Sequence, residues 1–217
     1  PGYRRARADA MEWVLFVSQL LNGLQLGVLL FLLAAGLTLV FGIMDFVNLA
    51  HGSLYMMGAY FCVTLNPLLG SFPLAVLVAI VLTFILGIAV ELVVSRPLYQ
   101  RDHLDQVLAT FGLILFFNGA VHLIWGPEGN PIALPEYLNG RFILPAGIEI
   151  PTFRVAIIAT GLAVAAGLIW LVTMTRMGML IRAGASNRRM AGALGVDIKK
   201  LFTLVFALGA AMAGLAG

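Results

Sequence analysis

Residues 72–94 read FPLAVLVAIVLTFILGIAVELVV, a run in which Glu91 is the one charged side chain. A helix needs about 20 predominantly apolar residues to cross the hydrocarbon layer of a bilayer, and this run is long enough. Pro73 stands near its start, where a missing N–H costs a helix little. The stretch therefore predicts a membrane-spanning helix and decides the fold class of the chain.

The composition of the whole chain agrees with this interpretation. Hydrophobic residues make up 61% of the 217 residues and charged residues 11%, with a mean hydropathy of +1.02. A soluble domain is typically about half apolar and a quarter charged, and it could not bury this much apolar surface. We predict an all-α fold, a polytopic transmembrane helical bundle of about five to six membrane segments. These segments form a single transmembrane domain over residues 1–217.

Apolar runs elsewhere in the chain supply the other segments. Residues 53–69 are short for a span and contain Gly58 and Pro67. They either cross the membrane or form a re-entrant segment packed inside the bundle. The remaining predicted spans are residues 14–41, residues 107–125, residues 153–174 and a last one that starts at 201.

Lysine and arginine concentrate in cytoplasmic loops, so the charges predict an orientation. Residues 176–200 carry six basic residues against one acid, Asp197, and are predicted to be cytoplasmic. Counting spans backwards places residues 126–152 outside and residues 95–106 inside. Three arginines within residues 4–7 conflict with the outside position that the same count gives the N-terminus, so its orientation stays open.

The two ends of the chain and the long loop complete the organisation. Residues 1–10 precede the first methionine, and we expect them to be an extension. The last apolar run stops at Gly217, so we expect the chain to continue beyond it. Residues 126–152 are rich in proline, and short strands are expected at 142–144 and 148–150.

The segment DFVNLAHG, residues 45–52, places polar groups between apolar runs. Polar side chains in or beside a bilayer are costly and tend to face the bundle interior or a water path. Asp45, Asn48 and His51 are spaced by three, so on a helix they would share a face. We identify them as candidates for a substrate pathway or gate. The alternative is a capping turn in which Asp45 and Asn48 bind backbone N–H groups and His51 binds a carbonyl.

An acid and a base lie close together near the end of the first quoted run. Glu91 precedes Arg96 by five residues and could pair with it, or with a basic residue of the later loop. An acid that snorkels to the interface is the commoner arrangement. Pro97 is expected to break the helix directly after the arginine.

The basic residues 176–200 also have the features of a docking segment. Ser186 is predicted to be the N-cap of a short helix that runs to Leu194, and Gly195 can close it in a left-handed conformation. A small apolar face on such a helix suits docking against a soluble protein. The residues that form this face are Met190, Ala193 and Leu194. The alternative is a basic anchor that holds lipid head groups.

Motifs for catalysis or cofactor binding are not found in the sequence. A single cysteine, Cys62, excludes an internal disulfide, and the histidines lie on different segments, so no metal site is predicted. There is no phosphate-binding glycine loop, so any ATP must be hydrolysed on another chain, and no cofactor is expected here. An intramembrane enzyme is a second hypothesis, but His51 and Ser53 would point apart on a helix. A passive channel is a third. We expect no catalytic residue.

Several stretches, in their order, carry a resemblance to a known family. They are GLTLVFGIMDFVNLAHGSLYMMGAY from residue 36, ELVVSRPLYQR from 91, ATFGLILFFNGAV from 109, LPEYLNGRF from 134, and TRMGMLIRAGASNRRMAGALGVDIKKLFTLVFALGAAMAGLAG from 175. In these stretches the chain resembles the permease subunits of bacterial ABC importers for branched-chain amino acids, in particular the smaller of the two paired permeases. Very similar permeases serve importers of urea and short-chain amides, which leaves the substrate open.

The resemblance implies a transporter of several subunits in the bacterial inner membrane. The expected partners are a second homologous permease, two cytoplasmic ATP-binding subunits and a periplasmic substrate-binding protein. Residues 175–200 correspond to the cytoplasmic coupling loop of the family, and residues 184–197 would contact the ATPase. The resemblance and the pattern together assign coupling to Arg182, Gly184, Ala185, Ser186, Met190, Ala193, Leu194, Gly195 and Asp197.

Overall fold

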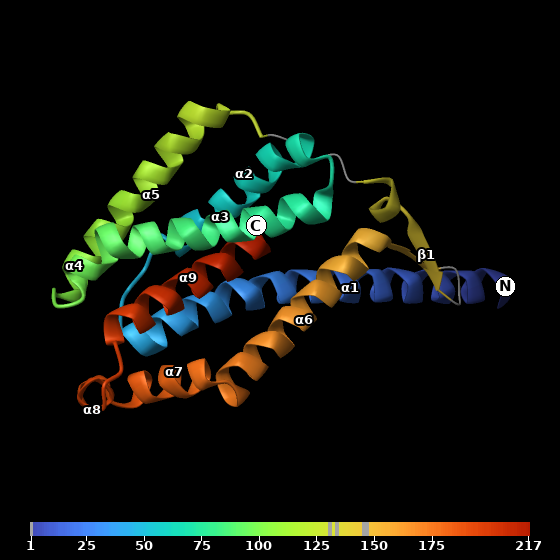
Figure 1. Cartoon of the computed structure of the whole chain (residues 1–217). Helices are drawn as coiled ribbons and strands as arrows, with labels where there is room; N and C mark the ends of the chain where they lie inside the picture. The colour runs from blue at the N-terminus through green and yellow to red at the C-terminus, as the bar shows by residue number, and fades with distance from the viewer. Residues whose placement is uncertain (1, 130–131, 133–134, 145–147) are drawn as a thin grey trace. The chain divides into compact units, whose positions relative to one another are not determined.

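The computed structural model describes residues 2–129, 132, 135–144 and 148–217 (Figure 1). Most of these residues are helical, which confirms the predicted polytopic helical fold. In chain order the elements are α1 (Gly2–Met44), α2 (His51–Leu69), α3 (Phe72–Val90), the π-helical turn η1 (Glu91–Ser95), α4 (Arg96–Leu98), α5 (His103–Trp125), the 3-10 turn η2 (Glu136–Leu138), β1 (Arg141–Leu144), β2 (Ile148–Pro151), α6 (Thr152–Met174), α7 (Arg176–Ser186), α8 (Arg188–Ala193) and α9 (Ile198–Ala216).

Helices long and apolar enough to cross a membrane account for most of the chain. Within the described residues there are five of them. They cover Glu12–Met44, Phe72–Leu98, His103–Trp125, Thr152–Met174 and Ile198–Ala216. The chain therefore has the helices of a multi-pass membrane protein, and the number agrees with the prediction.

The chain divides into two compact units, and each is described by itself. The smaller unit comprises residues 1–31 and 133–166, and the larger unit comprises residues 32–132 and 167–217. α1 contributes its first part to the smaller unit and its last part to the larger one. The segment 45–52, Glu91 and the basic segment 176–200 all belong to the larger unit, which therefore holds the residues of most functional interest.

A β-hairpin is the main non-helical feature of the smaller unit. β1 and β2 pair antiparallel, with Arg141 opposite Pro151 and Phe142 opposite Ile150. The short strands expected in the proline-rich loop are thereby confirmed. The backbone N–H of Thr152 donates to the carbonyl oxygen of Gly140 over 2.9 Å, so the hairpin leads directly into α6.

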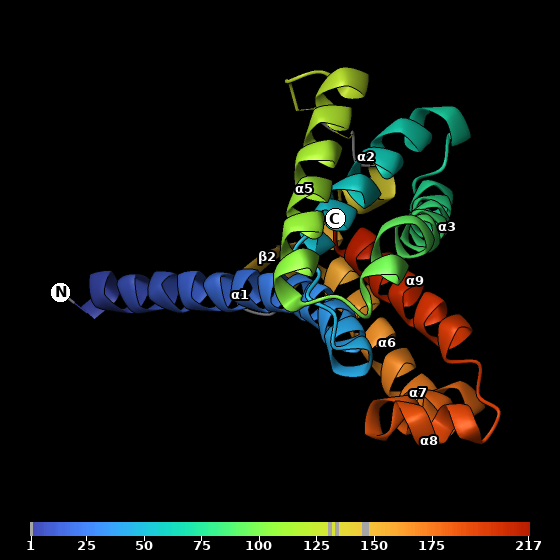
Figure 2. The same ribbon diagram turned by 90° about the vertical axis from the view of Figure 1, so that its left-hand side faces the viewer.

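Helix α9 is the centre of the larger unit, where it lies against α2 and α3 (Figures 1 and 2). Six of its buried residues are alanine or glycine, and such small residues let helix backbones approach one another closely in lipid. A Cβ atom on Gly58 of α2 would overlap the backbone of Gly214. A Cβ atom on Gly36 of α1 would stand 2.8 Å from the carbonyl oxygen of Gly209. The buried small residues of α9 are Ala207, Gly209, Ala210, Ala213, Gly214 and Ala216.

Two hydrogen bonds fix the course of α2 beside α5. Near the start of both helices, the backbone N–H of Val47 donates to Oε1 of Gln106 over 3.1 Å. Near their other ends, Nε1 of Trp125 donates to Oγ1 of Thr64 over 2.8 Å. The 19 residues of α2 span about 28 Å at 1.5 Å per residue, close to the thickness of the hydrocarbon layer. α2 is nevertheless not among the five described helices that are long and apolar enough to cross a membrane, so a crossing and a re-entrant segment both stay predictions for residues 53–69.

The helix around Pro97 differs from the expectation. It does not break after Arg96 but continues to Leu98, so that prediction is wrong. Proline cannot donate the backbone N–H that an α-helical turn requires. The turn before it, Glu91–Ser95, is π-helical and therefore wider than an α-turn. The irregularity thus lies ahead of the proline, and it rotates the side chains that follow.

Candidate functional site

The polar segment after α1 is not helical. α1 ends at Met44 and α2 begins at His51, so the expectation that three polar residues share one helical face is wrong. Asp45 is exposed and has a positive φ of 49°, which a short polar residue can adopt. Asn48 and His51 are buried, with 5% and 3% of their surface exposed. The structure therefore directs Asp45 outward and the other two side chains inward.

The two buried side chains differ in their hydrogen bonding. Nε2 of His51 lies 3.1 Å from the carbonyl oxygen of Leu33, and its ring packs beside Gly36. This matches the carbonyl contact of the capping alternative. Neither carboxamide atom of Asn48 has a hydrogen-bond partner among the described residues, so Asn48 caps no backbone N–H there. A buried amide without partners is costly, which makes Asn48 the more informative of the two.

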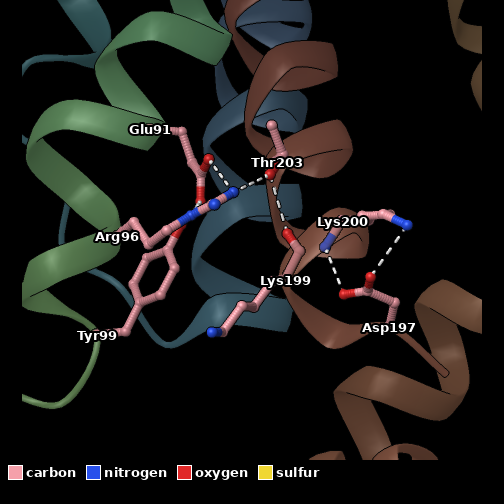
Figure 3. Close-up of polar contacts among 7 residues, drawn as sticks. All are labelled: Glu91, Arg96, Tyr99, Asp197, Lys199, Lys200 and Thr203. Atoms are coloured by element: carbon pink, nitrogen blue, oxygen red, sulfur yellow. Dashed lines mark hydrogen bonds and ion pairs between the residues drawn. The ribbon is translucent and has the colours of Figure 1, made fainter. Parts of the chain in front are cut away.

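An ion pair between a buried carboxylate and a partly exposed guanidinium lies where α3 passes into the π-helical turn. Nε and Nη2 of Arg96 donate to Oε1 and Oε2 of Glu91 over 3.2 and 3.1 Å. Nη2 also donates to Oγ1 of Thr203 on α9 over 2.7 Å, as Figure 3 shows. Glu91 is fully buried, so it does not snorkel, and its pairing with Arg96 is confirmed. The two-pronged contact holds the guanidinium in a fixed plane.

Tyr99 completes this cluster and extends it to two other segments. Its hydroxyl donates to Oε1 of Glu91 over 2.7 Å (Figure 3). Burial raises the pKa of Tyr99, and the bond to the Glu91 carboxylate raises it further, so the hydroxyl keeps its proton. The Tyr99 ring meets the ring of Phe46 edge to face at 5.8 Å and the ring of Phe202 at 5.3 Å. Tyr99 thus joins the π-helical turn, the segment after α1 and the start of α9.

The basic segment forms two helices rather than one. Ser186 is the last residue of α7, and α8 begins after Asn187, whose side chain accepts from the backbone N–H of Met190 over 3.0 Å. The predicted cap at Ser186 is therefore wrong by one residue, because the amide of Asn187 fulfils the same role.

The predicted end of α8 is confirmed. Gly195 has a φ of 89°, and its N–H donates to the carbonyl oxygen of Gly192 over 3.0 Å. The N–H of Val196 donates to the carbonyl oxygen of Ala191 over 3.1 Å. These two bonds are the pair that closes a helix through a left-handed residue. α8 is thus capped at both ends.

The apolar face predicted on α8 faces outward. Met190 and Leu194 are 60% and 79% exposed, and Ala193 is exposed as well. Ala191, on the other side of the helix, is buried.

Three of the other residues assigned to coupling, Arg182, Gly184 and Asp197, pack against or bind other parts of the chain. Arg182 donates to the carbonyl oxygen of Val172, and Gly184 is buried where a Cβ would stand 2.9 Å from the Leu201 side chain. Ala185 is exposed. Asp197 is the N-cap of α9: it accepts from the backbone N–H of Lys200 over 3.1 Å, which lowers the pKa of its carboxyl (Figure 3).

The cap of α8 gives a direct prediction. Asn187→Ala should destabilise α8 by about 1 kcal/mol, because the N–H of Met190 loses its acceptor. Ser186→Ala should leave α8 unchanged. Hydrogen–deuterium exchange of the amides of residues 190–193 measures the difference. Equal exchange in the two variants would contradict the assignment of the cap.

Sequence reasoning missed the partners that make these side chains a cluster. Tyr99 follows Arg96 by three residues, and this spacing was the available signal for it. Phe46, Gln106 and Thr203 lie far along the chain from their contacts, so only the fold brings them together.

The smaller unit contains an open pocket of about 360 Å³ that the sequence did not indicate. Two arginines, Arg141 and Arg154, give it a positive lining. Gln25 reaches it from α1, so residues more than a hundred positions apart meet there. The other lining residues are Leu138, Asn139, Gly140, Pro151 and Phe153. Among the described residues, no three histidine, cysteine or acidic side chains gather to hold a metal ion.

Similarity to known proteins extends over nearly the whole chain. A family model described as the branched-chain amino acid transport system permease component matches residues 19–217. BraD of Pseudomonas aeruginosa, a high-affinity branched-chain amino acid transport system permease protein, is 32% identical over 214 residues, which are 93% of this chain and 69% of BraD. LivH of Escherichia coli K12, described in the same words, is 32% identical over 220 residues, which are 95% of this chain and 70% of LivH.

A third protein is also similar to this chain. The probable LivH permease of Methanocaldococcus jannaschii is 30% identical over 199 residues, which are 87% of this chain and 61% of that protein. No solved structure matches the chain. The family match includes the segment after α1, the Glu91–Arg96 ion pair and α8. This chain, a multi-pass membrane protein, belongs to the permease family of the branched-chain amino acid transport system.

Proposed function

We propose that this chain is the membrane-spanning permease subunit of a binding-protein-dependent ABC importer that carries branched-chain amino acids across a bacterial inner membrane. The family membership supports the transporter class, and the names of its relatives support the substrate class. Permeases for urea and short-chain amides are the alternative that experiment has to separate. In this proposal the chain holds no cofactor, and ATP is hydrolysed on two separate ATP-binding subunits.

The exposed apolar face of α8 carries the proposal. A helix capped at both ends displays Met190 and Leu194 to the surroundings at the basic end of the larger unit. An amphipathic helix of this kind suits a groove on a soluble partner. We assign this end to the cytoplasm because its six basic residues follow the positive-inside pattern.

Two arginine contacts favour a protein partner over a lipid anchor. Arg182 is bound to the carbonyl oxygen of Val172. The guanidinium of Arg188 lies over the ring of Phe202, 5.5 Å from its centroid. A head-group anchor would turn such side chains toward the lipid, whereas these two are turned toward their own chain. The remaining subunits of the proposed assembly are a second homologous permease and a periplasmic substrate-binding protein.

Asn48 and His51 are the candidates for the pathway or gate. Both are buried beside α1, and Asn48 has hydrogen-bonding capacity that the described residues leave unused. Asp45, which is exposed, fits the gate rather than the path.

Uptake of labelled leucine by cells that express the chain with its partner subunits tests the proposal. We expect uptake that requires ATP and persists with an excess of unlabelled urea. The double variant Met190→Asp, Leu194→Asp should lose both the ATP-binding subunit on purification and at least about nine-tenths of the uptake, because charges replace the apolar face. The matched control, Met190→Leu with Leu194→Met, should keep both. Urea uptake in place of leucine would overturn the substrate, and an unaffected Asp variant would overturn the docking role of α8.

A further inference from the structure

We propose that Tyr99, anchored by Glu91 and Arg96, is a positioning residue that links movement of α8 to the position of the polar segment at residues 45–50. The inference rests on the proposed function, since it concerns how docking of an ATPase would reach the interior.

The first step leads from α8 to α9. Arg188 is the first residue of α8, and its guanidinium lies over the Phe202 ring. Thr203, the next residue of α9, accepts from Nη2 of Arg96 over 2.7 Å. The start of α9 is therefore held from one side by α8 and from the other by the Glu91–Arg96 ion pair. A displacement of α8 acts on Phe202 before it acts on any other ring of this cluster.

The second step passes through Tyr99. The centroid of its ring lies 5.3 Å from that of Phe202 and 5.8 Å from that of Phe46, and both ring pairs meet edge to face. Its hydroxyl is fixed to the carboxylate of Glu91, which is itself fixed by two bonds to Arg96. The ring can therefore turn about an anchored tip but cannot leave its place without breaking charge-assisted hydrogen bonds.

Residues 45–50 have the features of a backbone segment that can adopt two conformations. Phe46 is fully buried and lies two residues before Asn48, whose carboxamide is buried without a partner among the described residues. Asp45 next to it has a positive φ, which is rare outside glycine. The backbone between them is held by one bond, from Val47 to Gln106. A shift of Phe46 would therefore change the surroundings of Asn48.

The π-helical turn adds a second site where bonding is incomplete. Ser95, its last residue, is fully buried, and its Oγ has no partner among the described residues. Such turns inside α-helices are frequent at functional sites. Unpaired polar atoms thus occur at Ser95, four residues before Tyr99, and at Asn48, two residues after the Phe46 that Tyr99 contacts. A second arrangement that gives each of them a hydrogen-bond partner would compete with the one described here.

The test is the ratio of leucine transported to ATP hydrolysed, measured on the complete transporter in liposomes. Tyr99→Leu removes both ring contacts and the anchor. We expect the variant to retain its partner subunits and its ATP hydrolysis while the ratio falls at least about tenfold. Tyr60→Leu is the matched control, because it removes a comparable ring contact, that with Trp125 at 5.0 Å, and should keep the wild-type ratio.

A second variant separates the loss of the hydrogen bond from a failure of the protein to fold. Tyr99→Phe keeps both rings in contact and removes only the bond to Glu91, so it should fold and show a smaller fall in the ratio. An unchanged ratio in an assembled Tyr99→Phe transporter would overturn the proposal, and so would an equal fall in Tyr60→Leu. If the wild-type transporter itself moves no leucine with ATP, the proposed function fails instead, and the two failures are distinguished before any variant is made.

Discussion

Arg96→Met should lower the free energy of unfolding by about 3 kcal/mol, the largest stability effect we expect in this chain and the lower end of the range for buried pairs, because the Arg96 side chain is 34% exposed. Glu91 is fully buried, and Arg96 supplies two of the bonds to its carboxylate. Removing the cation leaves a buried negative charge whose one remaining described donor is the hydroxyl of Tyr99. Thermal unfolding of the purified protein in detergent, followed by size-exclusion chromatography, measures the loss.

Two further variants show whether the charge is the cause. The double variant Glu91→Gln, Arg96→Met removes both charges and should recover most of the lost stability, since replacing a whole buried pair is often nearly neutral. Arg101→Met removes an exposed arginine five residues along and should change little. A double variant no more stable than Arg96→Met alone would show that packing, rather than the unpaired charge, sets the loss.

Gly58→Ala should cost about 1–3 kcal/mol, although alanine favours a helix over glycine. The added Cβ would overlap the backbone of Gly214, and a backbone cannot rotate away as a side chain can. The two helices must therefore separate, and the contact between α2 and α9 weakens. The same unfolding measurement in detergent shows the effect as a lower midpoint temperature.

The neighbouring glycines provide an order of effects. A Cβ on Gly214 would stand 2.6–2.7 Å from Oγ1, Cβ and Cγ2 of the fully buried Thr83, so Gly214→Ala should cost about as much as Gly58→Ala. Gly112 on α5 has nothing within 4 Å of such a Cβ, and Gly112→Ala should be neutral or slightly stabilising. A loss at Gly112 as large as at Gly58 would contradict the explanation by backbone contact.

Local patterns were enough to predict the elements but not their contacts. Hydropathy predicts the spans because lipid demands about 20 apolar residues from each, whatever their neighbours. The pairing of Glu91 with Arg96 could be predicted because the two residues are five positions apart in the sequence. Tyr99 and Thr203 join them only through the packing of α9, and no periodicity in the chain encodes that.

The errors arose where one local rule competed with another. Ser186 and Asn187 are both good caps, and the sequence gives no reason to prefer the second. Residues 45–50 have the spacing of a helical face, yet Asp45 takes a left-handed conformation that ends α1. Pro97 should stop a helix, but a wider turn ahead of it removes the need for its N–H.

The glycine contacts of α9 have a mechanical consequence. Where backbone lies close to backbone, as at Gly36 with Gly209 and Gly58 with Gly214, a larger side chain at any of these positions would force the helices apart. The distance between α9 and its neighbours is therefore set by the missing Cβ atoms at these glycines.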